Sequence, residues 1–408
     1  MITENQTHIP EGWKESELGA VIVEKAKSTI KVSEAANFGE YPFFTSGDSI
    51  LLHDKKIIDG ENLFLATGGV ANIKYFDGEA AYSTDTFAIS TNEDAKAQYL
   101  YYYLLSKVGY INKNYFEGSG LKHLQKKDFR KHAFVLPTSP IEQQKIASIL
   151  SKLDEAITQT EQLIGKYKKI KEGLMHDLLT RGIDEQGNIR LEDTHKFKDS
   201  PLGRIPKEWE CCEIGNACYV TKLSGFEFTK YMEYRDDGEI IAIRAMNIKN
   251  EQLILDDVQR ISKKVSEFLV RSKLHSGDIL ITYIGAYIGD ILQIKEDNKY
   301  HLAPNVAKIV GGPKLTPDFL EFMMRSTKVQ RFIKSLVTTT ANPSLTMGQI
   351  RTVYIIYPKD KKEQDRISKR LSTLNILINK TSSELEKLFL QKSGLMHDLL
   401  TGKIRVQI

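Results

Sequence analysis

A histidine followed by an aspartate occurs twice in this chain, each time inside the octapeptide GLMHDLLT, at 173–180 and at 394–401. Imidazole and carboxylate groups act as acid, base or metal ligand when they converge on one point. They do not converge on a helix, because neighbouring helical residues point about 100° apart, and no second histidine lies three or four residues away. We therefore expect His176 and His397 to pack at an interface, with metal ligation or a pH switch as the alternatives.

The other residue types that catalyse reactions form no complete motif. Cys211, Cys212 and Cys218 are clustered without zinc-ligand spacing, so we expect reduced thiols. Asn342-Pro-Ser-Leu lacks the second proline and the aromatic residue with which an amino-methyltransferase holds a flipped base. There is no phosphate-binding loop of the G-x-x-x-x-G-K-[S/T] type, and Gly68-Gly69 is too sparse for a dinucleotide site. The sequence predicts no enzyme activity, no cofactor and no metal in this chain; the alternative is an enzyme whose site has no familiar motif.

Composition limits the class of protein. With 408 residues, 41% hydrophobic and 27% charged, the chain is typical of a globular protein of two to four domains. No apolar run approaches the roughly 20 residues that cross a bilayer, and the polar start lacks a signal-peptide core, so we expect a cytoplasmic protein without a membrane partner. A net charge of +4 is small for a domain that binds DNA unaided, so DNA binding would require partner proteins.

The octapeptide is the end of a much longer repeat at an offset of 221 residues. PTSPIEQQKIASILSKLDEAI, from Pro137, aligns without a gap to PKDKKEQDRISKRLSTLNILI, from Pro358. Apolar residues recur at alternating spacings of four and three, which predicts a long helix packed against another helix. The predicted packing residues are Ile146, Leu150, Leu153, Ile157, Ile164, Leu174 and Leu178 in the first copy, and Ile367, Leu371, Leu374, Ile378, Leu385, Leu395 and Leu399 in the second.

Both predicted helices have matching start and stop signals. Ser139-Pro-Ile-Glu142 and Asp360-Lys-Lys-Glu363 are capping boxes, in which a side-chain oxygen and a glutamate satisfy exposed N–H groups. Gly182 and Gly402 follow the last periodic residues and can end a helix in the left-handed conformation. Each helix therefore spans about 40 residues, or roughly 60 Å.

A second match shows that the whole chain is duplicated. PEGWKESELG from Pro10 aligns with PKEWECCEIG from Pro206, at an offset of 196, so the block between this opening motif and the helix is 25 residues longer in the second copy. Inside the blocks, GENLFLATGG and GDILITYIGA predict strands, whereas AQYLYYYLLSKVGYI and PDFLEFMMRSTKVQRFI each predict an apolar helix. We predict a first domain at 1–136, a spacer helix at 137–181, a linker at 182–205, a second domain at 206–357 and a second spacer helix at 358–408.

These boundaries predict an α+β protein, with two mixed α/β domains separated by two long antiparallel helices in a pseudo-two-fold internal repeat. Two copies of one unit tend to pack about an approximate two-fold axis, which makes equivalent helices antiparallel. Duplex DNA has dyads of its own, and two-fold proteins read half-sites whose spacing mirrors the protein.

The order PEGW…LG, variable block, P…EQ..I, long helix and G-L-M-x-x-L-L-T-G, repeated once, resembles the specificity subunit of a type I restriction-modification system over essentially the whole chain. The resemblance implies two target recognition domains, each reading one half of a bipartite sequence in double-stranded DNA. It implies that the helices are the conserved spacer regions that set the gap. It also implies docking with two methyltransferase subunits and then with ATP-dependent restriction subunits, to which S-adenosylmethionine, ATP and Mg²⁺ would belong.

Loops before the last strand of each block are the candidates for DNA contact. EGSGLKH (117–123) and VTTTANPS (337–344) combine hydrogen-bonding groups with residues that allow close approach, as base edges and phosphates require. The candidate residues are Lys122, His123, Thr339, Thr340 and Asn342; the alternative is an ordinary surface loop. Tyr101–Tyr103 covers three faces of a helix, which predicts core packing of at least part of the run, with base stacking as the other reading. For the whole chain, the competing hypothesis is a coiled-coil scaffold that spaces two protein partners without meeting DNA.

Overall fold

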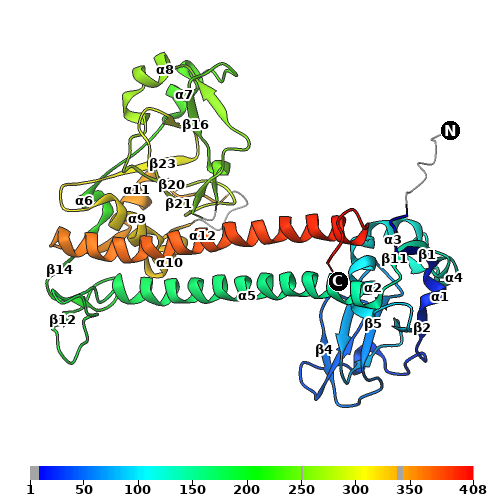
Figure 1. The fold of residues 1–408 in the computed structure, drawn as a ribbon. Helices are drawn as coiled ribbons and strands as arrows, with labels where there is room; N and C mark the ends of the chain where they lie inside the picture. The colour runs from blue at the N-terminus through cyan, green and yellow to red at the C-terminus, as the bar shows by residue number, and fades with distance from the viewer. Residues whose placement is uncertain (1–8, 250, 338–342, 408) are drawn as a thin grey trace. The chain divides into compact units, whose positions relative to one another are not determined.

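The computed structural model describes residues 9–249, 251–337 and 343–407. The chain forms two compact units: unit 1 is Met1–Leu163 with Thr381–Ile408, and unit 2 is Ile164–Lys380. Each unit contains one mixed α/β domain and half of each of two long helices, α5 (Pro140–Leu178) and α12 (Lys361–Leu400) (Figure 1). The compact units therefore cut across the linear repeats, because each long helix begins in one unit and ends in the other.

The domain of unit 1 is built on two small sheets and a strand pair. The strand pair joins the opening motif to the end of the block: β1 (Trp13–Glu17) runs antiparallel to β11 (Ala133–Pro137). The larger sheet has the order β2-β8-β5-β6 and the smaller one β4-β3-β7, with β3 and β7 parallel. The strands are β2 (Ile22–Glu24), β3 (Tyr41–Phe44), β4 (Leu51–His53), β5 (Glu61–Ala66), β6 (Ile73–Asp77), β7 (Ala81–Tyr82) and β8 (Thr86–Thr91), and the helices are α1 (Leu18–Val21), α2 (Ala97–Ser106), α3 (Val108–Asn114) and α4 (Lys126–Arg130).

The domain of unit 2 repeats this plan strand for strand. β14 (Trp209–Glu213) pairs with β24 (Tyr354–Pro358), the larger sheet has the order β15-β23-β20-β21, and the smaller one β19-β16-β22 again has one parallel pair. Its strands are β15 (Cys218–Lys222), β16 (Ile240–Ile243), β19 (Gln259–Ile261), β20 (Ile279–Thr282), β21 (Ile291–Gln293), β22 (Tyr300–Leu302) and β23 (Val306–Gly311), and its helices include α6 (Ile214–Ala217), α9 (Pro317–Arg325), α10 (Thr327–Leu336) and α11 (Met347–Arg351). The predicted duplication of one mixed fold is confirmed.

The residues that lengthen the second copy lie mainly between β15 and β20. This interval holds α7 (Gly225–Tyr231), the hairpin of β17 (Ile248–Lys249) and β18 (Gln252–Leu253), and α8 (Lys263–Phe268). The corresponding interval of unit 1, residues 25–60, is described throughout and contains no α-helix. The added elements cover the smaller sheet, where Leu223, Leu269 and Leu274 pack with Ile243 and Leu302 in a separate core cluster.

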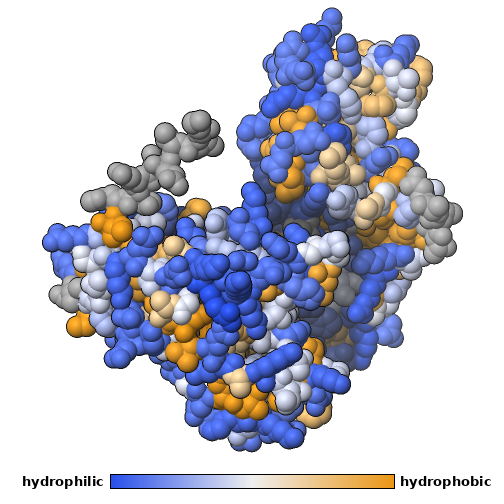
Figure 2. All heavy atoms as spheres, turned by 90° about the vertical axis from the view of Figure 1, so that its right-hand side faces the viewer, coloured by the Kyte–Doolittle hydropathy of each residue, from blue (hydrophilic) through white to orange (hydrophobic). Residues whose placement is uncertain are grey.

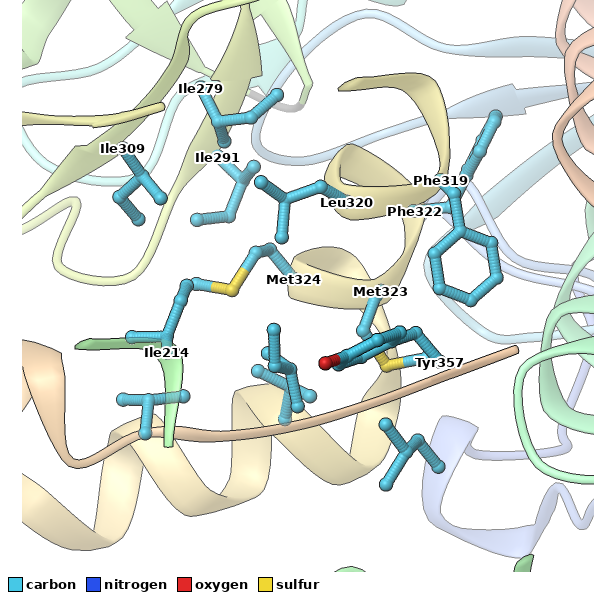
Figure 3. Packing of buried hydrophobic residues seen from close by; sticks show 14 of the residues in the cluster. Ile214, Ile279, Ile291, Ile309, Phe319, Leu320, Phe322, Met323, Met324 and Tyr357 are labelled. Carbon is cyan, nitrogen blue, oxygen red and sulfur yellow. The ribbon is translucent and has the colours of Figure 1, made fainter. Parts of the chain in front are cut away.

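The main core of unit 2 lies between the larger sheet and α9. Figure 3 shows Phe319, Leu320, Phe322, Met323 and Met324 of α9 gathered with isoleucines of the sheet, Ile279, Ile291 and Ile309. Burial of such side chains stabilises the fold by about 25 cal/mol per Å² of apolar surface. The core also includes Leu178 of α5 and Ile367 and Leu371 of α12, together with Leu179, which directly follows α5. The core of unit 1 likewise includes Ile146, Leu150, Leu399 and Leu400.

Within each unit the two half-helices are antiparallel. In unit 1, Asp154 of α5 accepts a hydrogen bond from Lys392 of α12, whereas Glu142, nearer the start of α5, pairs with Arg405, beyond the end of α12. α5 has 39 residues and α12 has 40, and Gly182 and Gly402 follow them with φ of +65° and +69°. All of the residues predicted to line the packed stripes are buried or half-buried.

Two local predictions were wrong. Each predicted apolar helix is in fact two helices, α2 with α3 and α9 with α10, separated at Lys107 and at Ser326. Ser326 has an extended ψ of 145° and its side chain caps α10, which ends the preceding helix. The apolar pattern continues through both breaks, so periodicity alone did not reveal them.

On the face shown in Figure 2, hydrophilic residues cover most of the area and hydrophobic residues form small separate patches. Among the described residues, no helix combines the length and the apolar character needed to span a membrane.

Candidate functional site

The predicted loop of unit 1 joins two short strands, β9 (Phe116–Glu117) and β10 (His123–Leu124). Lys122 and His123 are exposed, and the main chain of the loop is tied to the turn after β5, where Gly69 N–H donates to the carbonyl of Lys122 at 2.8 Å. Gly69 has a φ of +83°, which favours glycine in this turn. The structure therefore brings the loop beside the Gly68-Gly69 turn of the larger sheet.

A basic cleft lies next to this loop, with a volume of about 430 Å³. Lys25, Lys27, Lys126 and His123 line it, together with the threonines Thr67, Thr84 and Thr86. Burial lowers the pKa of Lys126, and Arg130 and Lys27 add to this effect, whereas Glu24 opposes it. The Nζ atom of Lys126 lies 4.1 Å from the centre of the Phe87 ring, which positions the cation at the cleft wall.

The chemistry of this cleft matches the sugar-phosphate backbone and base edges of DNA. Ammonium groups supply the electrostatic part of the affinity, and hydroxyl and imidazole groups can donate to or accept from base edges. Of the cleft residues, sequence reasoning found His123 and missed Lys25, Lys27 and Lys126. The signal present was VEKAKS, which begins in β2 and continues beyond it, and QKKDFRK after the candidate loop, but nothing local shows that the two segments meet.

Unit 2 has a different surface near its corresponding turn. Thr339, Thr340 and Asn342 lie outside the described residues. A cavity of about 370 Å³ is lined by Arg244, Tyr234, Met246 and Tyr287, beside the turn at Gly285. Asp257 holds Arg244 in place, with its Oδ1 atom 3.0 Å from a terminal guanidinium nitrogen. The two domains thus share a fold but differ in the side chains near the turn. Those of unit 1 are rich in lysine, whereas those of unit 2 are aromatic and include Arg244, which is paired with Asp257.

The tyrosine run is structural. Tyr102 and Tyr103 are 2% and 6% exposed, and both belong to the core of unit 1. Tyr102 donates a hydrogen bond to Asp154 of α5 at 2.8 Å, and burial together with this carboxylate raises the pKa of the phenol. Tyr103 OH lies 2.8 Å from Nε2 of His132. The bond from Tyr102 fixes α2 against α5, and the contact of Tyr103 with His132 fixes α2 against the segment after α4. Neither tyrosine has a face left for base stacking.

A pair of adjacent residues at the start of each long helix connects three segments of its unit. Gln143 is fully buried; its side chain accepts from the N–H of Lys96 at 2.7 Å and donates to the carbonyls of Asp94 and Pro137. Gln364 makes the equivalent bonds, accepting from the N–H of Thr316 at 2.8 Å and donating to the carbonyls of Lys314 and Pro358. Each glutamine therefore fixes the segment leading into α2 or α9 against the start of the long helix.

The neighbouring glutamates bind arginines that follow the other long helix. Glu142, 1% exposed, pairs with Arg405 through both carboxylate oxygens, at 2.6 and 2.8 Å. Glu363 pairs with Arg190 and also accepts from Trp209 Nε1 at 3.3 Å and the N–H of Ile183 at 3.1 Å. Although burial opposes the charge, the hydrogen bond with Glu363 raises the pKa of Arg190. We call Glu142-Gln143 and Glu363-Gln364 the EQ clamps.

The predicted capping boxes form only in part: the side-chain cap is present at each helix start, but the glutamate takes another partner. Ser139 Oγ accepts from the N–H of Glu142 at 3.4 Å and Asp360 Oδ1 from the N–H of Lys362 at 2.9 Å, so a side-chain cap exists at both starts. The glutamates do not return to the cap, because Arg190 and Arg405 bind them. Sequence reasoning missed Arg190 and Arg405; the available signal was Ile-Arg-Leu and Ile-Arg-Val after the two helices.

The octapeptide histidines are exposed, contrary to the expected packing. His176 borders a small hollow with Met323 and Lys328 at the junction of α9 and α10. His397 borders a cavity of about 470 Å³ with Tyr103 and Lys107 at the junction of α2 and α3. The leucines of the octapeptide pack inward instead. Among the described residues, no group of three histidine, cysteine or acidic side chains is arranged to hold a metal ion.

The chain thus contains two copies of one mixed domain, each completed by the ends of both long helices. The family model for the type I restriction modification DNA specificity domain matches residues 10–171 and again 206–387. The chain belongs to this family and contains its domain twice.

Curated relatives agree with this assignment. The type I restriction enzyme MjaVIII specificity subunit of Methanocaldococcus jannaschii is 27% identical, over 98% of this chain and 94% of the relative. The EcoBI specificity subunit of Escherichia coli is 23% identical over 85% of this chain and 74% of the relative. The crystal structure of a type I restriction-modification S subunit from M. genitalium has the same fold, with a TM-score of 0.66, 15% identity and 98% coverage of both chains.

Proposed function

We propose that this chain is the DNA specificity subunit of a type I restriction-modification complex, in which each recognition domain reads one half of a bipartite target. The observation that carries the proposal is the duplicated domain whose two copies keep one fold and one set of clamps while the side chains around the equivalent turns differ. One scaffold with two divergent surfaces is suited to reading two different half-sites.

The helix pair sets the gap between the half-sites in this proposal. The helices are anchored to the domains by the EQ clamps and by core residues at both ends, so the length of the pair is transmitted to the domains. Methylation and cleavage belong to partner subunits, two methyltransferase subunits and restriction subunits, which supply S-adenosylmethionine, ATP and Mg²⁺ chemistry. This chain contributes recognition and spacing.

Co-expression with the methyltransferase partner tests the proposal. Genome-wide mapping of methylated bases should reveal a single bipartite motif with a fixed gap, present only when this chain is supplied. Methylation that does not change when the chain is omitted would favour the scaffold hypothesis and overturn ours.

The repeated octapeptide supplies the proposed docking surface for the methyltransferase subunits. Gly173 and Gly394 lie inside α5 and α12, and no atom lies within 4 Å of where a Cβ would stand. A glycine inside a helix costs about 1 kcal/mol of stability relative to alanine. No contact within the described chain requires a glycine at either position. His176 and His397 are exposed three residues further on, on the same side of each helix. We infer that the same partner approaches both sites closely.

Gly173→Ala with Gly394→Ala should raise the melting temperature of this chain while weakening its assembly with methyltransferase subunits by at least tenfold. Calorimetry measures the melting temperature, and titration followed by light scattering measures assembly with the methyltransferase subunits. Gly165→Ala is the matched control, since Gly165 is also an exposed glycine inside α5 with open space around it but lies outside the octapeptide. Unchanged assembly in the double variant would exclude the octapeptide as the docking surface.

A further inference from the structure

The cavity of unit 2 beside Gly285 lies where three segments of the recognition domain meet. Gly285, in the turn after β20, donates its N–H to the carbonyl of Pro343, which belongs to the second candidate loop, at 3.4 Å. Tyr283 donates its N–H to the carbonyl of Asn305, in the segment after β22, at 3.0 Å. Comparable main-chain bonds occur beside the basic cleft of unit 1, from Thr67 to Asp85 and from Gly69 to Lys122. The cavity therefore lies at the same junction of its domain as the cleft does in unit 1.

Arg244, which directly follows β16, lines this cavity and is held at both ends. Its N–H donates to Oδ1 of the buried Asn247 at 3.1 Å, and Nδ2 of Asn247 donates to the carbonyl of Asp257 at 2.8 Å. Asp257 in turn accepts from Nη2 of Arg244 through its carbonyl, at 2.9 Å, and lies 3.0 Å from it through Oδ1. A side chain fixed in this way before binding loses little conformational entropy when a ligand arrives.

The guanidinium of Arg244 keeps donors for a ligand. Its side chain is 22% exposed, and in the described structure no residue accepts from Nη1. The buried Nε also has no hydrogen-bond partner there. Nη1 carries two N–H groups, and Tyr234, Tyr287 and Met246 line the cavity around them. The site therefore combines one oriented cationic donor with aromatic and apolar walls.

We propose that Arg244 reads a guanine in the half-site of the second recognition domain, with Asp257 as its positioning residue. This inference rests on the proposed function, because it assumes that the domain reads DNA. Guanine presents two acceptors, N7 and O6, in the major groove, and a basic side chain on these atoms is the commonest specific contact. A phosphate fits less well, because the Asp257 carboxylate beside the guanidinium is 62% exposed and would repel it, whereas the guanine edge is uncharged.

The first recognition domain has a threonine at the equivalent place. β3 and β16 correspond, since the last residue of each, Phe44 or Ile243, accepts an N–H from the residue that follows its parallel partner strand. The next residue is Thr45 in unit 1 and Arg244 in unit 2. Thr45 is 7% exposed, and its hydroxyl accepts from the N–H of Gly47 at 3.1 Å. The contact with guanine therefore belongs to the second half-site alone.

The test uses the full chain assembled with its methyltransferase subunits. Arg244→Met, Arg244→Lys and Asp257→Asn are compared with Arg271→Met, a control that removes an exposed arginine paired with Glu227 in the same unit, away from the residues that line the cavity. Methylated sites are mapped genome-wide, and methylation rates are measured on duplexes in which each base pair of the half-sites is replaced in turn. The half-site of the second domain is the one that an exchange of residues 20–136 leaves unchanged.

Arg244→Met should relax one G·C position of that half-site, lowering the preference for guanine by about ten- to a hundredfold and leaving the other half-site and the gap unchanged. Arg244→Lys keeps the charge but lacks the planar fork that Asp257 holds, so it should relax the same position. Asp257→Asn should relax it in part, because the main-chain carbonyl still holds Nη2. The control should keep the wild-type motif.

Two results would overturn the inference. One is a wild-type half-site of the second domain that contains no G·C pair. The other is an unchanged motif in Arg244→Met, whether its affinity stays the same or falls uniformly for every duplex, since a uniform fall would assign Arg244 to a phosphate. If the wild-type complex itself gave no bipartite motif, the proposed function would fail, which is a separate result.

Discussion

A buried carboxylate requires a cation or several hydrogen-bond donors, and this chain has one at the start of each long helix. The two EQ clamps are alike in their partners but differ in exposure. The Glu363–Arg190 pair is buried on both sides, with side-chain exposures of 4% and 9%. In the other clamp Arg405 is 40% exposed, although Glu142 is 1% exposed. Water can therefore replace one arginine more easily than the other.

Arg190→Met should lower the free energy of unfolding of unit 2 by about 3 kcal/mol, because it leaves a buried charge unpaired. Arg405→Met should cost unit 1 only about 1 kcal/mol, because water reaches that site. The chain has two tryptophans, Trp13 beside Arg405 and Trp209 beside Glu363. Urea unfolding followed by fluorescence in a Trp13→Phe or Trp209→Phe background therefore reports each unit separately. Equal losses in the two units would contradict the difference in burial.

The repeat identified the clamp residues but not their partners. Glu142-Gln143 and Glu363-Gln364 stand at equal positions in two aligned segments, so the sequence marks them. Arg405 is 263 residues from Glu142 and Arg190 is 173 residues from Glu363 in the opposite direction along the chain. Only the folded chain brings such pairs together. The basic cleft was missed for the same reason, because Lys25 and Lys126 meet through the sheet and not through local spacing.

The long helices were the most predictable elements, because their signals are local. Apolar spacing, side-chain caps and terminal glycines together gave lengths close to the observed 39 and 40 residues. The strand pair between the opening motif and the end of each block was not predicted, since residues 13–17 and 133–137 are paired only in three dimensions. Local rules describe elements well, and they say little about which distant strands meet.

Insertion of seven residues after Ile157 and seven after Ile378 should lengthen the helix pair by about 10 Å while keeping the heptad spacing of its apolar stripe. The recognition domains would keep their surfaces, so the half-sites should stay the same and the gap should grow by about three base pairs, at about 3.4 Å each. Methylation mapping of the altered complex measures both quantities. A changed half-site with an unchanged gap would rule out the helix pair as the spacer.

At the scale of the molecule, we expect each recognition domain to be exchangeable as a unit. Replacing residues 20–136 with the equivalent block of another family member should change one half-site and leave the other half-site and the gap unaltered. The incoming block must retain the main-chain groups that Gln143 holds before α2. Methylation mapping before and after the exchange gives the comparison. If both half-sites changed together, the domains would not be reading DNA independently.

The exchange of helix ends between units has a consequence for synthesis on the ribosome. Unit 2 includes the end of α5, which has already been synthesised when the domain of unit 2 emerges from the ribosome. Unit 1 takes Leu399, Leu400 and Arg405 from chain that is made after the second domain. At about 5–20 residues per second, Glu142 waits on the order of ten seconds or longer for Arg405. The domain that is translated first is therefore the last to close its core, and a chaperone or a partner has that interval in which to meet it.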